Sequence, residues 1–125
     1  MAYDYDDQNI FARILRGEIP NTTVAEADHT LAFADIAPQA THHVLVIPKG
    51  AYVTADDFAA NASADEIVDF WRTFAKIAQD LGVTPDTSDG YRMISNAGTH
   101  GVQEVPHFHL HVLGGNPLGR MLQAN

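Results

Sequence analysis

The heptapeptide HFHLHVL, residues 107–113, is the stretch that decides how the chain is organised, because it carries a histidine at every second position. Side chains alternate between the two faces of a β-strand, so a strand over 107–113 puts His107, His109 and His111 on one face. The apolar residues between them take the other face. Uncharged imidazoles are costly to bury without hydrogen-bond partners. The pattern therefore predicts an apolar face on the core and a histidine face that forms the functional site.

Three interpretations of the histidine row are open from the residues alone. In one, the histidines are polar side chains on a solvated strand, and in another, two adjacent ones bind a catalytic metal ion with His43, His100 or a carboxylate. One ion cannot easily take all three, because at about 3.3 Å per residue the Cβ atoms of His107 and His111 lie about 13 Å apart. The third interpretation, nucleophilic attack by His109 on a phosphate, is favoured. A neutral imidazole with a pKa of about 6.5 is largely deprotonated at pH 7.

The segment of residues 95–106 leads directly into the histidine row and contains two glycines, Gly98 and Gly101. Glycine allows backbone conformations that turn N–H groups toward an anion. Because the segment lies immediately before the histidines, we predict that it forms a loop that contacts a phosphate. An ordinary connection between two strands is the alternative.

Working outward from these segments, apolar spacing and turn residues predict an α+β domain with a mainly antiparallel sheet. The clearest helix follows Ser63, which opens a capping-box pattern, and ends at Gly82, with Trp71 and Phe74 in the apolar stripe that packs on the core. A continuous apolar run at 44–47 predicts a central strand covered on both faces. The predicted elements are helix 8–16, strands 22–26, 30–35 and 44–47, helix 64–81, and strands 91–95 and 107–113.

Composition and charge exclude several classes of protein. The chain has 125 residues, 46% of them hydrophobic, which suits a single domain over 1–125. A net charge of −9, with Lys49 and Lys76 as the only lysines, argues against binding to polymeric nucleic acid. No segment approaches the roughly 20 apolar residues of a membrane helix, the opening residues are acidic, and cysteine is absent. We therefore expect a soluble, cytoplasmic protein without a thiolate nucleophile, a cysteine metal site or contact with a membrane.

The histidine row and the glycines that follow it form a specific motif. Residues 107–113, read as H-x-H-x-H-x-x, resemble the signature of the histidine-triad (HIT) superfamily, and the pair Gly114-Gly115 resembles its Hint branch. The resemblance implies the HIT fold, a mainly antiparallel five-stranded sheet with one long and one short helix. It also implies a homodimer, in which two copies pair through the long helix and a strand into one continuous sheet; from the sequence, the strand at 91–95 is a candidate for that edge. Further similarity is found in residues 10–20, 33–40, 43–49, 90–92 and 101–115, and residues 116–121 are similar to the tail of bacterial members.

The resemblance assigns roles to five polar residues. The middle histidine of the family motif is the nucleophile, and it corresponds to His109. His111 and the loop residue Asn96 correspond to groups that contact the phosphate. His43 and His107 correspond to residues that support the orientation of the nucleophile.

Other residues correspond to the nucleotide pocket of the family. Asp35 matches an aspartate that holds the ribose hydroxyls, although a turn or capping role is equally open from the sequence. The purine is held in a slot of apolar side chains, which suits a flat base, and ordinary core packing is the alternative for several of them. The slot residues are expected to be Ile10, Phe11, Ile14, Phe33 and Ile36.

The loop before the histidine row is expected to contribute Val102, Glu104 and Val105 to substrate binding. Val102 replaces a glycine that is common at that place in the family, although its backbone N–H is still able to serve. Glu104 stands where animal members carry a serine near the scissile bond. A carboxylate repels an anionic phosphate unless it is protonated or hydrogen-bonded away, but it could instead donate a proton to the leaving amine.

The resemblance implies hydrolysis of purine nucleoside 5′-phosphoramidates to a nucleoside monophosphate and an amine, through a covalent nucleotidyl-His109 intermediate. No cofactor and no metal is expected, and the expected partners are a purine nucleotide and a second copy of the chain. Two alternatives are open, a second hydrolase and a protein of another class. One is a dinucleoside polyphosphate hydrolase of the fragile-histidine-triad type, and the other is a nucleotide-binding regulatory protein without turnover.

Overall fold

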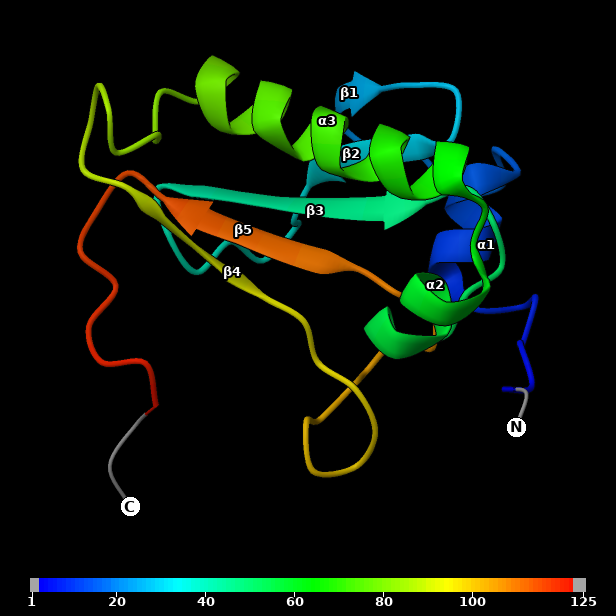
Figure 1. Ribbon diagram of the computed structural model, residues 1–125. Coiled ribbons are helices and arrows are strands. Elements are labelled where there is room, and N and C mark those ends of the chain that lie inside the picture. The colour runs from blue at the N-terminus through cyan, green and yellow to red at the C-terminus, as the bar shows by residue number, and fades with distance from the viewer. Residues whose placement is uncertain (1–2, 123–125) are drawn as a thin grey trace.

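The computed structural model describes residues 3–122 (Figure 1). Over this range the chain forms one five-stranded antiparallel sheet, in the order β1-β2-β3-β5-β4, and three helices. The α+β prediction is therefore confirmed. The elements are α1 (Ile10–Leu15), β1 (Thr23–Glu26), β2 (Thr30–Ala34), β3 (His42–Pro48), α2 (Ala55–Asn61), α3 (Ala64–Asp80), β4 (Tyr91–Ile94) and β5 (Leu110–Gly114).

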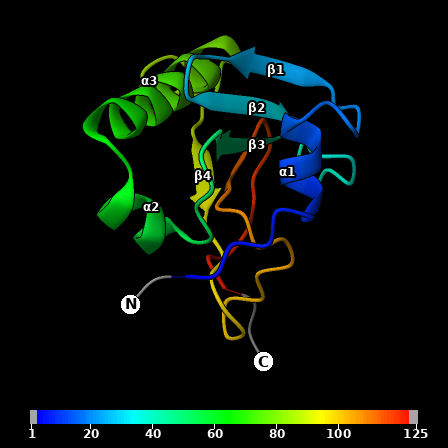
Figure 2. The ribbon, with the colours of Figure 1, turned by 90° about the vertical axis from the view of Figure 1, so that its right-hand side faces the viewer.

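Strand β3 is central, as its continuous apolar run predicts. It pairs with β2 on one side, where Leu45 lies opposite Phe33, and with β5 on the other, where Leu45 lies opposite His111. All its residues from His43 onward are buried. The strand is covered on both faces because a helix packs on each side of the sheet, α3 on one side and α1 on the other (Figure 2).

The α3 face carries the larger apolar cluster. Helix α3 begins at the predicted capping box, in which the Ser63 hydroxyl accepts from the Glu66 backbone N–H and the Glu66 carboxylate accepts from the Ser63 backbone N–H. The helix runs along the sheet in Figure 1 and buries one apolar stripe against it. The buried cluster consists of Ala32, Val44, Val46, Phe58, Phe70, Phe74, Ile77, Ala78, Val83, Phe108, Leu110 and Val112.

The opposite face is covered by the short helix α1. Its N-cap is Asn9, whose side-chain oxygen accepts from the backbone N–H groups of Phe11 and Ala12. The apolar side of α1 then packs on β2 and β3. The second buried cluster consists of Phe11, Ile14, Leu31, Phe33, Leu45 and Ile47.

Three features differ from the sequence expectation, and the first is a second short helix, α2. Thr54 caps α2 by accepting from the backbone N–H of Asp57. The sequence signal is this Thr54-x-x-Asp57 spacing, but the helix buries a single large apolar residue, Phe58, and so has no apolar stripe to mark it.

The second difference is that β5 begins at Leu110, not at His107. Its ladder with β3 ends at the pair Val46–Leu110, and the backbone N–H of Phe108 donates instead to the Tyr52 carbonyl at 2.7 Å. The third difference is Trp71, which was expected in the core and is 44% exposed, although Phe74 is buried.

Among residues 3–122, no helix has the length and apolarity needed to cross a membrane.

Candidate active site

Of the three histidines of the row, His107 and His109 pack against Phe11 of α1, and His111 lies in β5. Although 107–109 precede the β5 ladder, their alternation persists, because Phe108 joins the α3-side cluster while His107 and His109 face Phe11. The Phe11 and His109 ring centroids are 4.9 Å apart at an interplanar angle of 85°. His107 and His109 are buried and His111 is half-buried. The histidine face is thus no solvated surface, since a second apolar cluster covers most of it.

Hydrogen bonds fix which nitrogen of His109 is free. The Nδ1 atom of His109 lies 2.7 Å from the carbonyl oxygen of His107. A carbonyl oxygen only accepts, so Nδ1 carries the hydrogen, and Nε2 of the neutral ring carries a lone pair. This geometry suits Nε2 of His109 to nucleophilic attack without an activating base.

Burial keeps these imidazoles neutral. It lowers the pKa of His107 to about 4 and also lowers the pKa of His109, against the opposing effects of its hydrogen bond to His107 and of the carboxylates of Asp35 and Glu104. Burial, together with the neighbouring His109 and His43, lowers the pKa of His111 to about 4. The row is therefore uncharged at pH 7.

A second hydrogen-bonded chain orients His111. The backbone N–H of Gln39 donates to Nδ1 of His43 at 3.1 Å, so the hydrogen of the neutral His43 ring is on Nε2. That Nε2 lies 2.9 Å from Nδ1 of His111. His111 accepts there, and its Nε2–H is left as a donor. The structure therefore places His43 against His111 and not against His109.

Asp35 follows directly after β2 and already serves the protein in two ways. Its Oδ1 atom accepts from the backbone N–H of Ala37 at 2.8 Å, which is the turn role left open from the sequence. Its Oδ2 atom lies 3.4 Å from Nε2 of His43. The carboxylate is half-buried, so part of it faces solvent at the edge of the histidine site.

A divalent cation has one candidate location within residues 3–122. Ligand atoms of Asp35, His43 and His111 all lie within 4.8 Å of one another, and two imidazoles with one carboxylate are a ligand set of catalytic zinc sites. This set differs from the expected pairing of two adjacent histidines of the row. Coordination through both rings would require the His43–His111 hydrogen bond to break, so metal binding competes with the arrangement described above.

Asn96 is brought to the same cavity as His43 and His111. This cavity has a volume of about 790 Å³, and its wall includes Arg92 of β4. The Arg92 guanidinium donates to the carbonyl oxygens of Gly119 and Arg120, at 2.7 and 3.2 Å, and so holds the C-terminal segment beside the cavity. The remaining residues that line the cavity are Gln39, Met93, Ile94, Ser95, Leu113, Met121 and Leu122.

The expected purine slot divides into core and surface residues. Phe11, Ile14 and Phe33 are buried in the α1-side cluster, as the core-packing alternative describes for Phe11 and Ile14. Ile10 is 44% exposed and Ile36 is 98% exposed. Val105 packs on the same cluster. Over the described residues 3–122, none of these slot residues lines the cavity that holds Asn96, His43 and His111.

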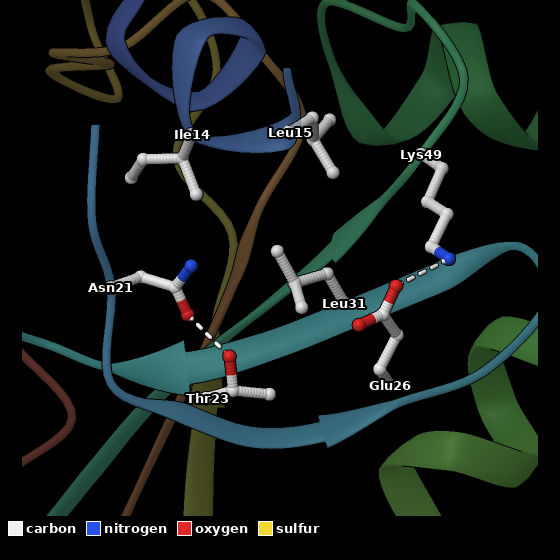
Figure 3. Close-up of a pocket in the computed structure, with 7 residues that line it drawn as sticks. All are labelled: Ile14, Leu15, Asn21, Thr23, Glu26, Leu31 and Lys49. Atoms are coloured by element: carbon white, nitrogen blue, oxygen red, sulfur yellow. Dashed lines mark hydrogen bonds and ion pairs between the residues drawn. The ribbon is translucent and has the colours of Figure 1, made fainter. Parts of the chain in front are cut away.

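A separate cavity of about 300 Å³ lies between α1 and the β1–β2 hairpin (Figure 3). It shares Ile14 with the expected slot and has Leu31 as its floor. An ion pair between Lys49 and Glu26, with 2.7 Å between Nζ and Oε2, lines one side of it. Lys49 is thus paired with Glu26 at this cavity and is not among the residues that line the cavity with His43 and His111.

The loop before the histidines contains an unusual backbone conformation at Val102. Its φ is 55°, in the left-handed region that β-branched residues rarely adopt, and the side chain is 67% exposed. Glu104 is exposed as well. The loop is fastened by Gln103, whose side-chain amide donates to the carbonyls of Val53 and Val105 at 2.6 and 3.1 Å.

Several contributors to the site were not found from the sequence. Gln39 acts through its backbone N–H, Pro48 through its carbonyl, Gln103 through its amide, and Tyr5 through a contact with His107. Backbone groups carry no residue-specific signal. Tyr5 and His107 are 102 positions apart, so no local pattern joins them.

Comparison with known proteins identifies the family of this chain. The HIT domain model matches residues 16–118. An uncharacterised HIT-like protein of Azospirillum brasilense is 52% identical over 122 residues, which is 98% of each chain. The purine nucleoside phosphoramidase of Escherichia coli K12 is 43% identical over 116 residues, 93% of this chain and 94% of that one. A solved histidine triad protein of Clostridium difficile has a TM-score of 0.78 and 39% identity, covering 90% of this chain and 95% of that one. The chain with the HFHLHVL row therefore belongs to the HIT-domain family.

Proposed function

We propose that this protein is a nucleotide hydrolase that cleaves purine nucleoside 5′-phosphoramidates into a nucleoside monophosphate and an amine. The observation that carries the proposal is the hydrogen bond from Nδ1 of His109 to the His107 carbonyl, which leaves a neutral Nε2 lone pair. The 43% identical relative in Escherichia coli is named for this activity, which supports the choice of substrate.

In the first step, Nε2 of His109 forms a bond to the α-phosphorus and the bond from phosphorus to the amine nitrogen breaks. The amine leaves with that electron pair and takes up a proton, for which the carboxyl group of Glu104, in its protonated form, is the proposed donor. The Nε2–H of His111 and the amide of Asn96 donate to the phosphoryl oxygens, where negative charge develops. His43 holds His111 in the tautomer that this requires.

In the second step, water attacks the phosphorus of nucleotidyl-His109 and gives up a proton to the Glu104 carboxylate left by the first step, while the electron pair of the phosphorus–nitrogen bond returns to Nε2. The nucleoside monophosphate is released and His109 is again neutral. Asp35 is proposed to hold the ribose hydroxyls, and Ile10 and Ile36 to cover the purine with the edge of the α1-side cluster. Loop residues Val102 and Val105 are proposed to contact the substrate from the other side.

The experiment is hydrolysis of adenosine 5′-phosphoramidate by purified protein in the presence of a chelator. We expect turnover that resists the chelator and that falls by a thousandfold or more, on the order expected for loss of a nucleophile, in His109→Ala. His29→Ala, at an exposed histidine outside the site, is the matched control and keeps the wild-type rate.

Each other result points to a different function. Loss of turnover on chelation supports a metal-dependent hydrolase whose ion is bound by Asp35, His43 and His111. Faster cleavage of a diadenosine polyphosphate than of the phosphoramidate supports the fragile-histidine-triad alternative. Tight nucleotide binding without turnover supports a regulatory binding protein.

We also propose that the functional unit is a homodimer. Helix α3 exposes Val68 and Trp71, at 52% and 44%, and the edge strand β4 exposes Met93, at 43%, which alternation places on the same side as Tyr91, the neighbour of Phe74. A second copy would cover this apolar surface and pair with the free edge of β4. Sedimentation equilibrium tests this, with Trp71→Glu expected to weaken the dimer and a monomeric wild type contradicting it.

A further inference from the structure

The segment ahead of α1 reaches the histidine face through Tyr5. The Tyr5 hydroxyl lies 2.7 Å from Nδ1 of His107. The two rings meet edge to face, with centroids 5.6 Å apart and an interplanar angle of 69°. Tyr5 is half-buried and His107 is fully buried. Tyr5 has no part in the reaction steps proposed for His109, so its contact with the row needs a separate account.

The direction of this hydrogen bond follows from the other side of the imidazole. Nε2 of His107 lies 2.8 Å from the carbonyl oxygen of Pro48, which accepts but cannot donate. Nε2 therefore carries the hydrogen, and Nδ1 of the neutral ring has a lone pair to which the Tyr5 hydroxyl donates. Both ring nitrogens of His107 are satisfied in a single tautomer between Tyr5 and Pro48.

Burial favours the uncharged forms that this contact needs. It lowers the pKa of His107 to about 4 and raises the pKa of Tyr5, so neither group is ionised at pH 7. Without the hydroxyl, Nδ1 becomes a buried acceptor without a partner. The alternative tautomer offers no relief, because it sets the Nε2 lone pair against the Pro48 carbonyl oxygen.

We propose that Tyr5 is a positioning residue for the nucleophile and acts on it through His107. The backbone carbonyl of His107 is the acceptor that holds Nδ1 of His109, at 2.7 Å. The Tyr5 hydroxyl holds the His107 side chain against Pro48 and so fixes the position of His107. The carbonyl of His107 in turn sets the orientation of the His109 ring, and with it the direction of Nε2. This inference rests on the proposed function, because the effect of Tyr5 on the orientation of His109 is measured as the rate of attack on phosphorus.

The kinetic test uses Tyr5→Phe, which keeps the ring and its edge contact and removes the hydroxyl. A displacement of about 1 Å can slow a reaction about 100-fold, so we expect partial loosening to slow formation of nucleotidyl-His109 in a single turnover about tenfold. The dissociation constant of AMP changes by less than about twofold, since the substrate contacts are kept. Tyr3→Phe is the matched control, because the Tyr3 hydroxyl donates to Asp56 of α2, and it keeps the wild-type rate.

Two kinetic outcomes overturn the proposal. A wild-type rate in Tyr5→Phe means that the hydroxyl does not position the nucleophile. A loss of AMP affinity as large as the loss of rate means that Tyr5 supports the fold of the site in general.

Imidazole ¹⁵N–¹H NMR of the unmutated protein tests the same contact without a variant. We expect neutral His107 to carry its hydrogen on Nε2 in both proteins, because the Pro48 carbonyl accepts there, and we expect the resonance of its unprotonated Nδ1 to shift downfield in Tyr5→Phe, where the hydrogen bond from the hydroxyl is lost. A hydrogen on Nδ1 of His107 in the wild type overturns the proposal. If the wild-type protein hydrolyses no phosphoramidate, the proposed function fails, whereas the NMR result still decides whether Tyr5 fixes His107.

Discussion

The α3 side and the α1 side of the sheet are built from the same strands, but they bury different chemistry. On the α3 side, aromatic and aliphatic side chains such as Phe70 and Val112 pack against one another. On the α1 side, His107 and His109 are buried beside Phe11. Burial on the first side contributes to the stability of the fold. Burial on the second side holds imidazoles in their neutral form, which suits a nucleophile and makes the fold sensitive to acid.

The largest expected effect on stability separates two neighbours in the chain that face opposite sides. Phe108 is buried on the α3 side and contacts Phe58 and Phe70, with ring centroids 5.2 Å apart in both pairs. Phe108→Ala should lower the free energy of unfolding by about 3–5 kcal/mol, as is typical for a phenylalanine removed from a core. Urea denaturation measures this loss. Ile36→Ala, at a side chain that is 98% exposed, is the control and should have almost no effect.

A loss below about 1 kcal/mol in Phe108→Ala would mean that this side collapses around the cavity and that the two sides differ less than their packing suggests.

A smaller effect concerns pH and is specific to the α1 side. The pKa of His107 is lowered by burial from its ordinary value of 6.5 to about 4, so below pH 6.5 the unfolded chain binds a proton that the folded protein does not. The free energy of unfolding therefore falls as the pH drops through 6.5 and continues to fall until about pH 4. Between pH 7 and 5 this group accounts for a loss of about 2 kcal/mol.

Urea denaturation at pH 7, 6 and 5 checks this dependence. His107→Gln should remove about 2 kcal/mol of the change between pH 7 and 5. His29→Ala should leave the pH dependence as in the wild type. An equal pH dependence in wild type and His107→Gln would show that burial of His107 is not its source.

The smallest expected effect lies in the loop that leads to the histidine row. Val102 has a φ of 55°, and the left-handed conformation costs a residue with a Cβ atom about 1–2 kcal/mol. Glycine adopts it freely but loses more chain entropy on folding, roughly 0.5–1 kcal/mol. Val102→Gly should therefore stabilise the protein by up to about 1.5 kcal/mol, which thermal unfolding detects as an increase in Tm of a few degrees. Val102→Ala keeps a Cβ atom and should gain less, and a Tm that falls in Val102→Gly would contradict the strain argument.

Much of the fold could be predicted from the sequence because the elements with a strong periodic signal dominate it. Helix α3 was expected over 64–81 and spans Ala64–Asp80, since a capping box and a long apolar stripe define it. The central strand was expected at 44–47 and spans His42–Pro48. Helix α2 was missed because one buried phenylalanine makes no stripe. The start of β5 was misplaced because alternation at 107–109 continues beyond the last paired residue.

The sequence predicted which residues form the site better than it predicted which of them contact one another. The spacing of the row indicated that His107 and His109 share a side of the sheet, and the structure agrees. The contact of His43 with His111, the turn held by Asp35 and the donor role of Tyr5 depend on pairs far apart in the chain. Trp71 was misjudged for a related reason, because a helical stripe shows which residues share a side but not how much of that side the sheet covers.

Trp71 is the single tryptophan of the chain, and its half-exposed position on α3 gives the protein a local spectroscopic reporter. Its indole packs edge to face on Phe70 and Phe74, at centroid distances of 5.4 and 5.8 Å, and the rest of it faces outward. Intrinsic emission therefore originates from α3, on the side of the sheet opposite to α1 and the buried imidazoles. Covering α3 with another chain would shift that emission to shorter wavelength, while a nucleotide bound on the far side would leave it unchanged. Assembly and ligand binding are thus optically separable without an added dye.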